Sequence, residues 1–406
     1  MSECLKAMPD GWHIVELSEI LQYEQPYHYI VLSEEYNDVF GIPVLTAGKS
    51  FLLGYTNESD NVYSNLPVII FDDFTTDSKY VDFPFKVKSS AMKFLRPRED
   101  VSIDLKLVFE YLQSLKISVA NSDHKRRWIS EFSKIKITIP PFEQQTKIAN
   151  ILSTCDAVIE KTQAAIAKYK LIKQGMLYDL FTRGIDIQTG KLSPRYQDAP
   201  ELYKESKLGW IPKEWEVESI SSIGEIITGS TPPTARSEFY GNNFLFVSPA
   251  DIQDNVYINE TGKKLTQSGF DVCRKLPKNT ICVVCIGSTI GKMALLDKEG
   301  CTNQQINSVI CFDSNLSTYF FYAMLFYNEQ QFRREIGLQA VPIVNKSHFS
   351  EFLVPVVQKA EALKIAECLM SIDTKLQSEQ SYLEKMQQIK KGLMEDLLSG
   401  KKRVKV

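Results

Sequence analysis

The sequence predicts a mixed α/β (α+β) fold built as an internal repeat. Two globular domains are separated by two long antiparallel coiled-coil helices, related by a pseudo-twofold axis. Three observations predict this architecture. An apolar heptad pattern extends over residues 142–181, the same pattern returns in phase at an offset of 217, and the two globular segments resemble each other at their ends. At 406 residues the chain is also too long for one ordinary hydrophobic core.

The first long helix is expected at residues 142–184, after a Pro-Pro pair. Alternating steps of four and three residues place a single seam along it: Ile148, Leu152, Cys155, Ile159, Thr162, Ile166, Tyr169, Lys173, Met176 and Leu180. Such a seam is typical of a coiled coil. Its polar interruptions are Thr162 and Lys173, and the helix would reach roughly 55–60 Å.

The second long helix is expected at residues 358–406, and its seam repeats the first one at an offset of 217. Its members are Ile365, Leu369, Ile372, Leu376, Glu379, Leu383, Met386, Lys390, Leu393 and Leu397. Two helices with a strict 3.5-residue repeat are expected to pack on each other with a left-handed twist. The linker at 185–210 is polar and too short to retrace the helix, which favours an antiparallel pair.

The first globular domain is expected at residues 1–141. Alternating residues predict strands at 11–17 and 133–139, a continuous apolar run predicts a buried strand at 67–73, and helical periodicity covers 105–115.

The second globular domain, at 211–357, repeats this plan. Its first residues echo 8–14 at an offset of 203, and its last echo the end of the first domain at an offset of 217. The pairs at that end are Phe132 with Phe349, Ile135 with Phe352, and Ile137 with Val354. Because the offset grows from 203 to 217 across the domain, the second copy is the longer one, and its additional residues all lie inside the globular part.

Basic residues in the first domain are candidates for contacting DNA phosphates. His124, Lys125, Arg126 and Arg127 precede Trp128, just before the last strand. Lysine and arginine neutralise phosphates, and arginine can also bind guanine with two hydrogen bonds. Weaker candidates are Lys49, Arg96 and Arg98. A solvated charge run is the alternative interpretation.

Polar loops are the corresponding candidates in the second domain. Amide side chains can read adenine, and hydroxyl groups and glycine amides can bind phosphate. The alternative interpretation is that these residues only form ordinary loops and turns, where the same residue types are common. The candidates are Thr228, Ser230, Thr231, Ser288, Thr289, Lys292, Asn303, Gln304, Gln305 and Lys346.

No catalytic residues and no metal site are predicted. The loop at 46–50 lacks the upstream glycine of a phosphate-binding loop, and the one at 287–293 lacks its final Ser or Thr. Cys282 and Cys285 have metal-ligand spacing, but strand alternation sends their thiols to opposite faces.

The protein is expected to be cytoplasmic. The N-terminus has no signal pattern, no apolar run approaches the length of a membrane span, and scattered cysteines fit reduced thiols. Because the net charge is −3, a nucleic-acid surface must be a local patch.

The order of parts, together with several short phrases, resembles the DNA-specificity subunit of type I restriction–modification systems. The phrases are Gly209-Trp210-Ile211-Pro212-Lys213-Glu214-Trp215, Thr228-Gly229-Ser230-Thr231-Pro232, Gly287-Ser288-Thr289-Ile290-Gly291, Asn303-Gln304 and Pro140-Pro141 followed by Gln144-Gln145. The second junction, at 355–358, departs from the family pattern, and the first domain lacks the Gly-Ser-Thr-Ile-Gly phrase. These departures indicate two recognition domains of different subtypes.

The resemblance implies a non-catalytic prokaryotic defence subunit whose two target-recognition domains read a bipartite sequence in double-stranded DNA. The helix pair would set the spacer. Two modification subunits would methylate adenine N6, and restriction (translocase and nuclease) subunits would cut unmethylated DNA. The chain would bind no cofactor itself, since S-adenosylmethionine, ATP and magnesium belong to those partners. The alternative is a coiled-coil adaptor that binds proteins and does not read DNA.

Overall fold

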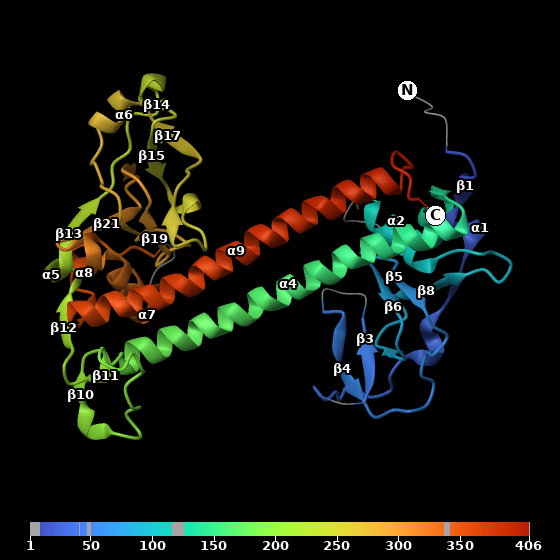
Figure 1. Ribbon diagram of the computed structural model, residues 1–406, viewed down its shortest axis with the longest axis horizontal. Coiled ribbons are helices and arrows are strands. Elements are labelled where there is room, and N and C mark those ends of the chain that lie inside the picture. Colours follow the sequence, from blue (N-terminus) through green and yellow to red (C-terminus); the bar gives the residue numbers. More distant parts are fainter. Residues whose placement is uncertain (1–8, 40, 47–49, 116–125, 337–341, 406) are drawn as a thin grey trace. The chain divides into compact units, whose positions relative to one another are not determined.

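The computed structural model describes residues 9–39, 41–46, 50–115, 126–336 and 342–405 (Figure 1). The chain divides into two compact units. Unit 1 consists of Met1–Thr162 and Tyr382–Val406, and unit 2 of Gln163–Ser381. Each unit therefore contains one globular head and one half of each long helix. Among the described residues, no helix is both long and apolar enough to cross a bilayer.

The head of unit 1 contains two small sheets and a separate strand pair. The four-stranded sheet has the order β2-β8-β5-β6, and the three-stranded sheet has the order β4-β3-β7. The predicted buried strand is confirmed as β5, in which every residue is buried. The bounds are β1 His13–Glu16, β2 Leu21–Glu24, β3 Ile42–Leu45, β4 Leu52–Thr56, β5 Val68–Asp72, β6 Ser78–Val81, β7 Lys86–Val87, β8 Met92–Pro97, β9 Lys136–Ile139, α1 Leu17–Ile20, η1 Pro26–Tyr29, α2 Leu105–Ser114, α3 Arg127–Ser130 and η2 Phe132–Lys134.

The head of unit 2 has a larger five-stranded sheet, β13-β21-β18-β19-β16, and a four-stranded sheet, β14-β17-β15-β20. Its strands are β10 Tyr203–Ser206, β11 Gly209–Pro212, β12 Glu216–Ser219, β13 Gly224–Thr228, β14 Tyr240–Gly241, β15 Phe244–Val247, β16 Tyr257–Ile258, β17 Lys263–Leu265, β18 Ile281–Val284, β19 Met293–Leu296, β20 Gly300–Thr302, β21 Ile306–Cys311 and β22 Leu353–Val356. Its helices are η3 Pro200–Leu202, α5 Ile220–Ile223, η4 Ser237–Phe239, η5 Pro249–Asp251, α6 Gln267–Asp271, η6 Ser314–Leu316, α7 Ser317–Ile336 and α8 Lys346–Ser350.

The internal repeat is visible in the strand pair that closes each head. In unit 1, β1 pairs antiparallel with β9, with His13 opposite Ile139. In unit 2, β12 pairs antiparallel with β22, with Glu216 opposite Val356. Adding 203 to the β1 residue and 217 to the β9 residue gives the unit 2 pair, so the two strand pairs have the same register.

Both predicted long helices are present, as α4 (Phe142–Arg183) and α9 (Lys359–Leu397). Figure 1 shows α4 in green and α9 in red. Every residue of the two seams is buried or half-buried, whereas Leu171 and Tyr178, which lie off the seam, are 69% and 61% exposed. The helix ends also complete the head cores: Leu152 packs in the core of unit 1, and Leu369 in that of unit 2.

Within unit 2 the two helices run antiparallel, as predicted. Ile185, just after α4, donates its backbone N–H to Glu361 near the start of α9. Farther back along α4, Lys173 pairs with Asp373, with 2.6 Å between Nζ and Oδ1. The equivalent pair in unit 1 joins Lys390 to Asp156 at the same distance. Adding 217 to Asp156 and Lys173 gives Asp373 and Lys390, so the two ion pairs are copies of each other.

A buried tryptophan anchors each head to the first turn of a long helix. The indole N–H of Trp215 donates to the Glu361 carboxylate at 3.2 Å, and that of Trp12 donates to Gln144 Oε1 at 3.3 Å. Gly184, with a φ of +74°, allows the chain to approach closely: a Cβ there would lie 2.3 Å from Glu361 Oε1. The two anchors are equivalent in the repeat, but their acceptors differ in charge.

We expect Glu361→Gln to stabilise unit 2 at pH 8 by about 1 kcal/mol, the scale of an imperfectly compensated buried polar group. Burial raises the pKa of Glu361 above its ordinary value of 4.5, although the Ile185 and Trp215 donors oppose this. A raised carboxyl pKa means that stability falls as pH rises from 4.5, and the amide removes that slope. Urea midpoints at pH 5 and 8 check this. Gln144→Glu is the matched control, and it should introduce the same slope in unit 1.

Two further findings concern sequence expectations. The segment expected as a linker contains the β10–β11 hairpin, in which Ile211 is buried and Trp210 stacks on Tyr196. The thiols of Cys282, in β18, and Cys285, the residue after the end of β18, lie in separate core clusters, as expected of side chains that point to opposite sides. No group of three potential metal-ligating side chains occurs within the described ranges.

Candidate nucleic-acid interface

Two of the predicted polar loops of unit 2 form one cluster. Because β13 pairs with β21, Thr228 lies opposite Asn307, and its hydroxyl donates to the Asn307 amide oxygen at 2.7 Å. The Thr231 hydroxyl donates to Gln304 Oε1 at 2.5 Å. Loops that are far apart in the sequence are therefore joined side chain to side chain.

Further contacts fix the path of the first loop. A Cβ at Gly229 would lie only 2.1 Å from the Asn303 carbonyl oxygen, so only glycine fits. Arg274 Nη1 donates to the Thr228 carbonyl at 2.6 Å, and the Arg274 backbone N–H donates to the Ser230 hydroxyl at 3.2 Å. Arg274 was not predicted as a site residue, because both of its partners lie in a loop that is distant in the sequence.

The third predicted loop lies beside this cluster through Gln305. Gln305 Nε2 donates to the Ile286 carbonyl at 3.5 Å, and a Cβ at Gly287 would lie 3.6 Å from the same nitrogen. Asn303 in turn donates to Gln305 Oε1 at 3.1 Å. Of the next two residues, Ser288 is exposed and Thr289 half-buried.

The predicted lysines of unit 2 are not part of this cluster. Lys292 is exposed and lines a different cavity of about 610 Å³, together with Lys170 of α4 and Gln253. Lys346 is exposed at the first position of α8.

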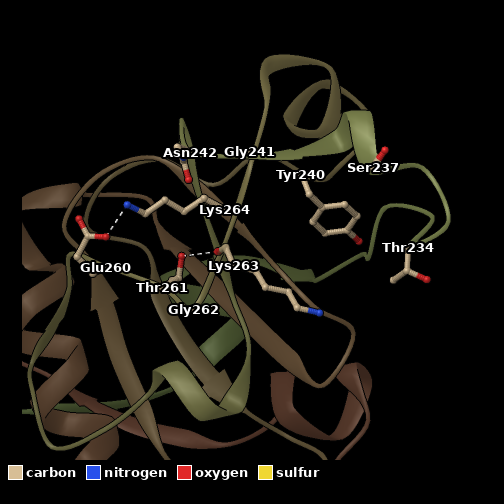
Figure 2. A pocket seen from close by; sticks show the side chains of 10 residues that line it. All are labelled: Thr234, Ser237, Tyr240, Gly241, Asn242, Glu260, Thr261, Gly262, Lys263 and Lys264. Atoms are coloured by element: carbon tan, nitrogen blue, oxygen red, sulfur yellow. Dashed lines mark hydrogen bonds and ion pairs between the residues drawn. The ribbon is translucent and has the colours of Figure 1, made fainter. Parts of the chain in front are cut away.

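An open polar cavity of about 550 Å³ lies next to the cluster (Figure 2). Tyr240 of its wall donates its hydroxyl to the Pro232 carbonyl at 2.9 Å, which ties the cavity to the first loop. The complete lining is Thr234, Ser237, Tyr240, Gly241, Asn242, Glu260, Thr261, Gly262, Lys263 and Lys264.

Two neighbouring lysines of the cavity differ in whether a described carboxylate pairs with them. Lys264 pairs with Glu260 at 2.5 Å. Figure 2 shows Lys263 extending away from that pair, and within the described part of the chain no carboxylate pairs with it. Lys263 was missed in the sequence because nothing in its local pattern separates it from an ordinary surface lysine.

In unit 1, the structure separates the members of the predicted basic run. Arg126 is exposed at the start of α3, whereas Arg127 is only 6% exposed and lies 3.5 Å from Glu131 Oε2. Arg127 was expected to contact a phosphate, but α3 turns its guanidinium inward, where it is buried. Asp73 holds this start of α3 by accepting the Trp128 N–H at 2.9 Å.

The remaining candidates of unit 1 are dispersed. Arg96 pairs with Glu24 at 3.4 Å, and Arg98 donates to the Ser18 carbonyl at 3.0 Å while remaining exposed. Lys49, His124 and Lys125 lie outside the described residues.

Comparison with known proteins places this architecture in a family. The sequence model of the type I restriction modification DNA specificity domain matches residues 9–168 and again 212–388. The specificity subunit of the Escherichia coli type I restriction enzyme EcoR124I/EcoR124II is 33% identical, over 91% of this chain and 89% of that protein. The MjaVIII specificity subunit of Methanocaldococcus jannaschii is 24% identical over 98% of this chain and 94% of that protein.

The crystal structure of the type I restriction–modification S subunit from M. genitalium shares this fold. It has a TM-score of 0.67 at 14% identity and covers 98% of both chains. The family match falls once on each head, and each match runs into the long helix that follows it. The chain therefore belongs to the DNA-specificity subunits of type I restriction–modification systems.

Proposed function

We propose that this non-catalytic specificity subunit reads a bipartite DNA target, with one half-site contacted by each head. The observation that supports this most directly is the internal repeat. The two heads close with the same strand register, and each rests on its own half of the helix pair. The heads differ in sheet size and in their polar loops, so they present different side chains to two half-sites.

For unit 2, we propose that DNA is contacted by the loop cluster and the adjoining cavity. The hydroxyls and amides of the cluster hydrogen-bond one another, which holds their remaining donors and acceptors in fixed directions. Lys263 adds a positive charge that no described carboxylate offsets, and such a charge can neutralise a DNA phosphate. For unit 1, the exposed Arg126 and Arg98 are the proposed phosphate contacts.

The proposed partners are two modification subunits and the restriction subunits of a type I complex in the cytoplasm. S-adenosylmethionine, ATP and magnesium would be bound by those partners, and this chain would position them on the DNA sequence. A methyltransferase must flip its adenine out of the duplex, so a reader that fixes the site relative to that enzyme has a clear physical use. The spacer between half-sites would be set by the length of the helix pair.

An electrophoretic shift with a pool of random-sequence duplexes tests the function. We expect sequence enrichment in the bound fraction, sharper when modification subunits are present. Binding of modification subunits without any enrichment of DNA sequence would instead support a protein adaptor.

Removing an exposed basic side chain that pairs with no carboxylate among the described residues is expected to lower the salt dependence of DNA binding. Lys263→Ala and Arg126→Ala should each reduce the slope of log K against log salt by about one, because each would release one counterion fewer. Fluorescence anisotropy over a range of roughly 50 to 200 mM salt measures this. Lys204→Ala, at a lysine already paired with Glu216, is the matched control. An unchanged slope for Lys263→Ala would show that this lysine faces only solvent.

A further inference from the structure

In both units, one side chain from the head joins the Lys–Asp pair between the long helices. In unit 2, Tyr322 of α7 donates its hydroxyl to Asp373 Oδ2, and Lys173 Nζ lies 5.6 Å from the centre of its ring. In unit 1, Glu110 of α2 lies with Oε2 3.0 Å from Lys390 Nζ. The third member of the group is thus a phenol in one unit and a carboxyl in the other.

These side chains occupy equivalent places in the repeat. Helices α2 and α7 are the long helices of their heads, and each precedes the strand that closes its head, β9 or β22. Both contacts are largely shielded from water: the side chain of Glu110 is 2% exposed, and that of Asp373 is 11% exposed. In each unit, the Lys–Asp pair between the helices is therefore contacted by a buried polar side chain of the head.

We propose that Glu110 and Tyr322 are positioning residues for DNA recognition, each fixing its head on the helix pair, and that only the Glu110 contact changes with pH. The positioning role rests on the proposed function, because a head must be held still to read its half-site. The pH dependence does not rest on the proposed function, because it follows from the difference between a carboxyl group, in Glu110, and a phenol, in Tyr322.

In unit 2 the contact is independent of pH. Burial, with the neighbouring Asp373 carboxylate, raises the pKa of the Tyr322 hydroxyl far above its ordinary value. The phenol therefore stays protonated and keeps donating to Asp373, while Lys173 balances the carboxylate charge.

In unit 1 two carboxyl groups share one ammonium. The titratable groups that face Glu110 are Lys390 from α9, and Asp156 and Cys155 from α4. Burial raises the pKa of Glu110 to about 7; Lys390 opposes the shift, and Asp156 adds to it. Burial also raises the pKa of the Cys155 thiol, which stays neutral. Glu110 can donate a hydrogen bond to Asp156, as Tyr322 donates to Asp373, only while its carboxyl group is protonated.

The sign of the effect follows from the direction of the shift. A carboxyl whose pKa is raised in the folded state stabilises that state most below its ordinary value of 4.5. This contribution declines as the pH rises toward about 7 and is constant above it. The Glu110 contact should therefore loosen between pH 4.5 and 7, while the Tyr322 contact does not change.

Hydrogen exchange of the full chain at pH 5.5 and 7.5 tests the proposal. After correction for intrinsic exchange rates, we expect the protection of α2 amides to fall about tenfold between these values and that of α7 to stay constant. Glu110→Gln keeps a donor without a charge and should abolish the change in α2. Tyr322→Phe should lower the protection of α7 equally at both pH values. An equal response of α2 and α7, or a response that persists in Glu110→Gln, would overturn the pH dependence.

Binding to the random duplex pool tests the positioning role separately. The affinity of the wild-type chain should fall severalfold more than that of Glu110→Gln between pH 5.5 and 7.5. If α2 responds to pH but both chains bind DNA alike, the contact is structural and the positioning role is refuted. If neither chain binds any duplex, the proposed function itself fails, and the exchange data show whether the pH-dependent contact exists without it.

Discussion

Deleting one heptad from each long helix is expected to shorten the spacer between the two DNA half-sites by about three base pairs. Seven residues of α-helix span about 10 Å, and base pairs are stacked about 3.4 Å apart. Suitable deletions are residues 161–167 and 379–385, which lie between the two Lys–Asp pairs and leave both intact. Because seven residues make nearly two turns, the apolar seam stays in phase. Mapping methylated sites, with modification subunits present, measures the spacer.

The matched control is the deletion of residues 161–167 alone. It shortens α4 against an unchanged α9, so one of the two Lys–Asp pairs must break, and binding should be lost without a new spacer appearing. A double deletion that keeps the original spacer would refute the proposal that the helix pair sets it. A double deletion that binds only isolated half-sites would show that the heads read DNA but are not held at a fixed separation.

Replacing Trp215 with alanine is expected to destabilise unit 2 by about 3–5 kcal/mol, the cost of truncating a buried tryptophan. Trp215 is 1% exposed and packs in the core that also contains the ends of both helix halves. Its loss would also remove the indole donor of the buried Glu361 and leave the Ile185 backbone N–H as its donor among the described residues. The urea midpoint of the unfolding transition measures the effect.

Trp210→Ala is the matched control, because Trp210 lies in the neighbouring hairpin but is 46% exposed and stacks on the ring of Tyr196. Its effect on the free energy of unfolding should stay below about 1.5 kcal/mol, the range of an aromatic pair. Similar losses in the two variants would mean that Trp215 does not anchor the head to α9.

The long helices could be predicted because a heptad seam is a local property of the chain, set by which residues fall on one face. The seam also revealed Lys173 and Lys390 as interruptions. Their partners were not identified, because Asp156 and Asp373 each lie one residue beyond a seam position and look like ordinary exposed acids in sequence. The helix pair brings each aspartate within 2.6 Å of its lysine.

The candidate interface was predicted only in part. Glycine and polar loops marked the cluster around Thr228 and Gln304, since turn chemistry is local. Lys263 and Arg274 carry no such signal, and they gain significance only from neighbours far along the chain. For Glu110 the sequence does contain a signal, because this charged residue stands among the apolar residues of an amphipathic helix, α2. Its partner Lys390 belongs to α9, near the other end of the chain.

The duplicated plan, the long helices and the family could all be inferred from the amino-acid sequence, because they depend on periodicity and on the order of parts. Which side chains meet was settled by the packing of the folded chain. That packing turned Arg127 inward, joined the loops of unit 2 into one cluster, and gave equivalent Lys–Asp pairs a carboxyl in unit 1 and a phenol in unit 2. Contacts between distant segments arise only when the elements pack in three dimensions, and no local pattern encodes them.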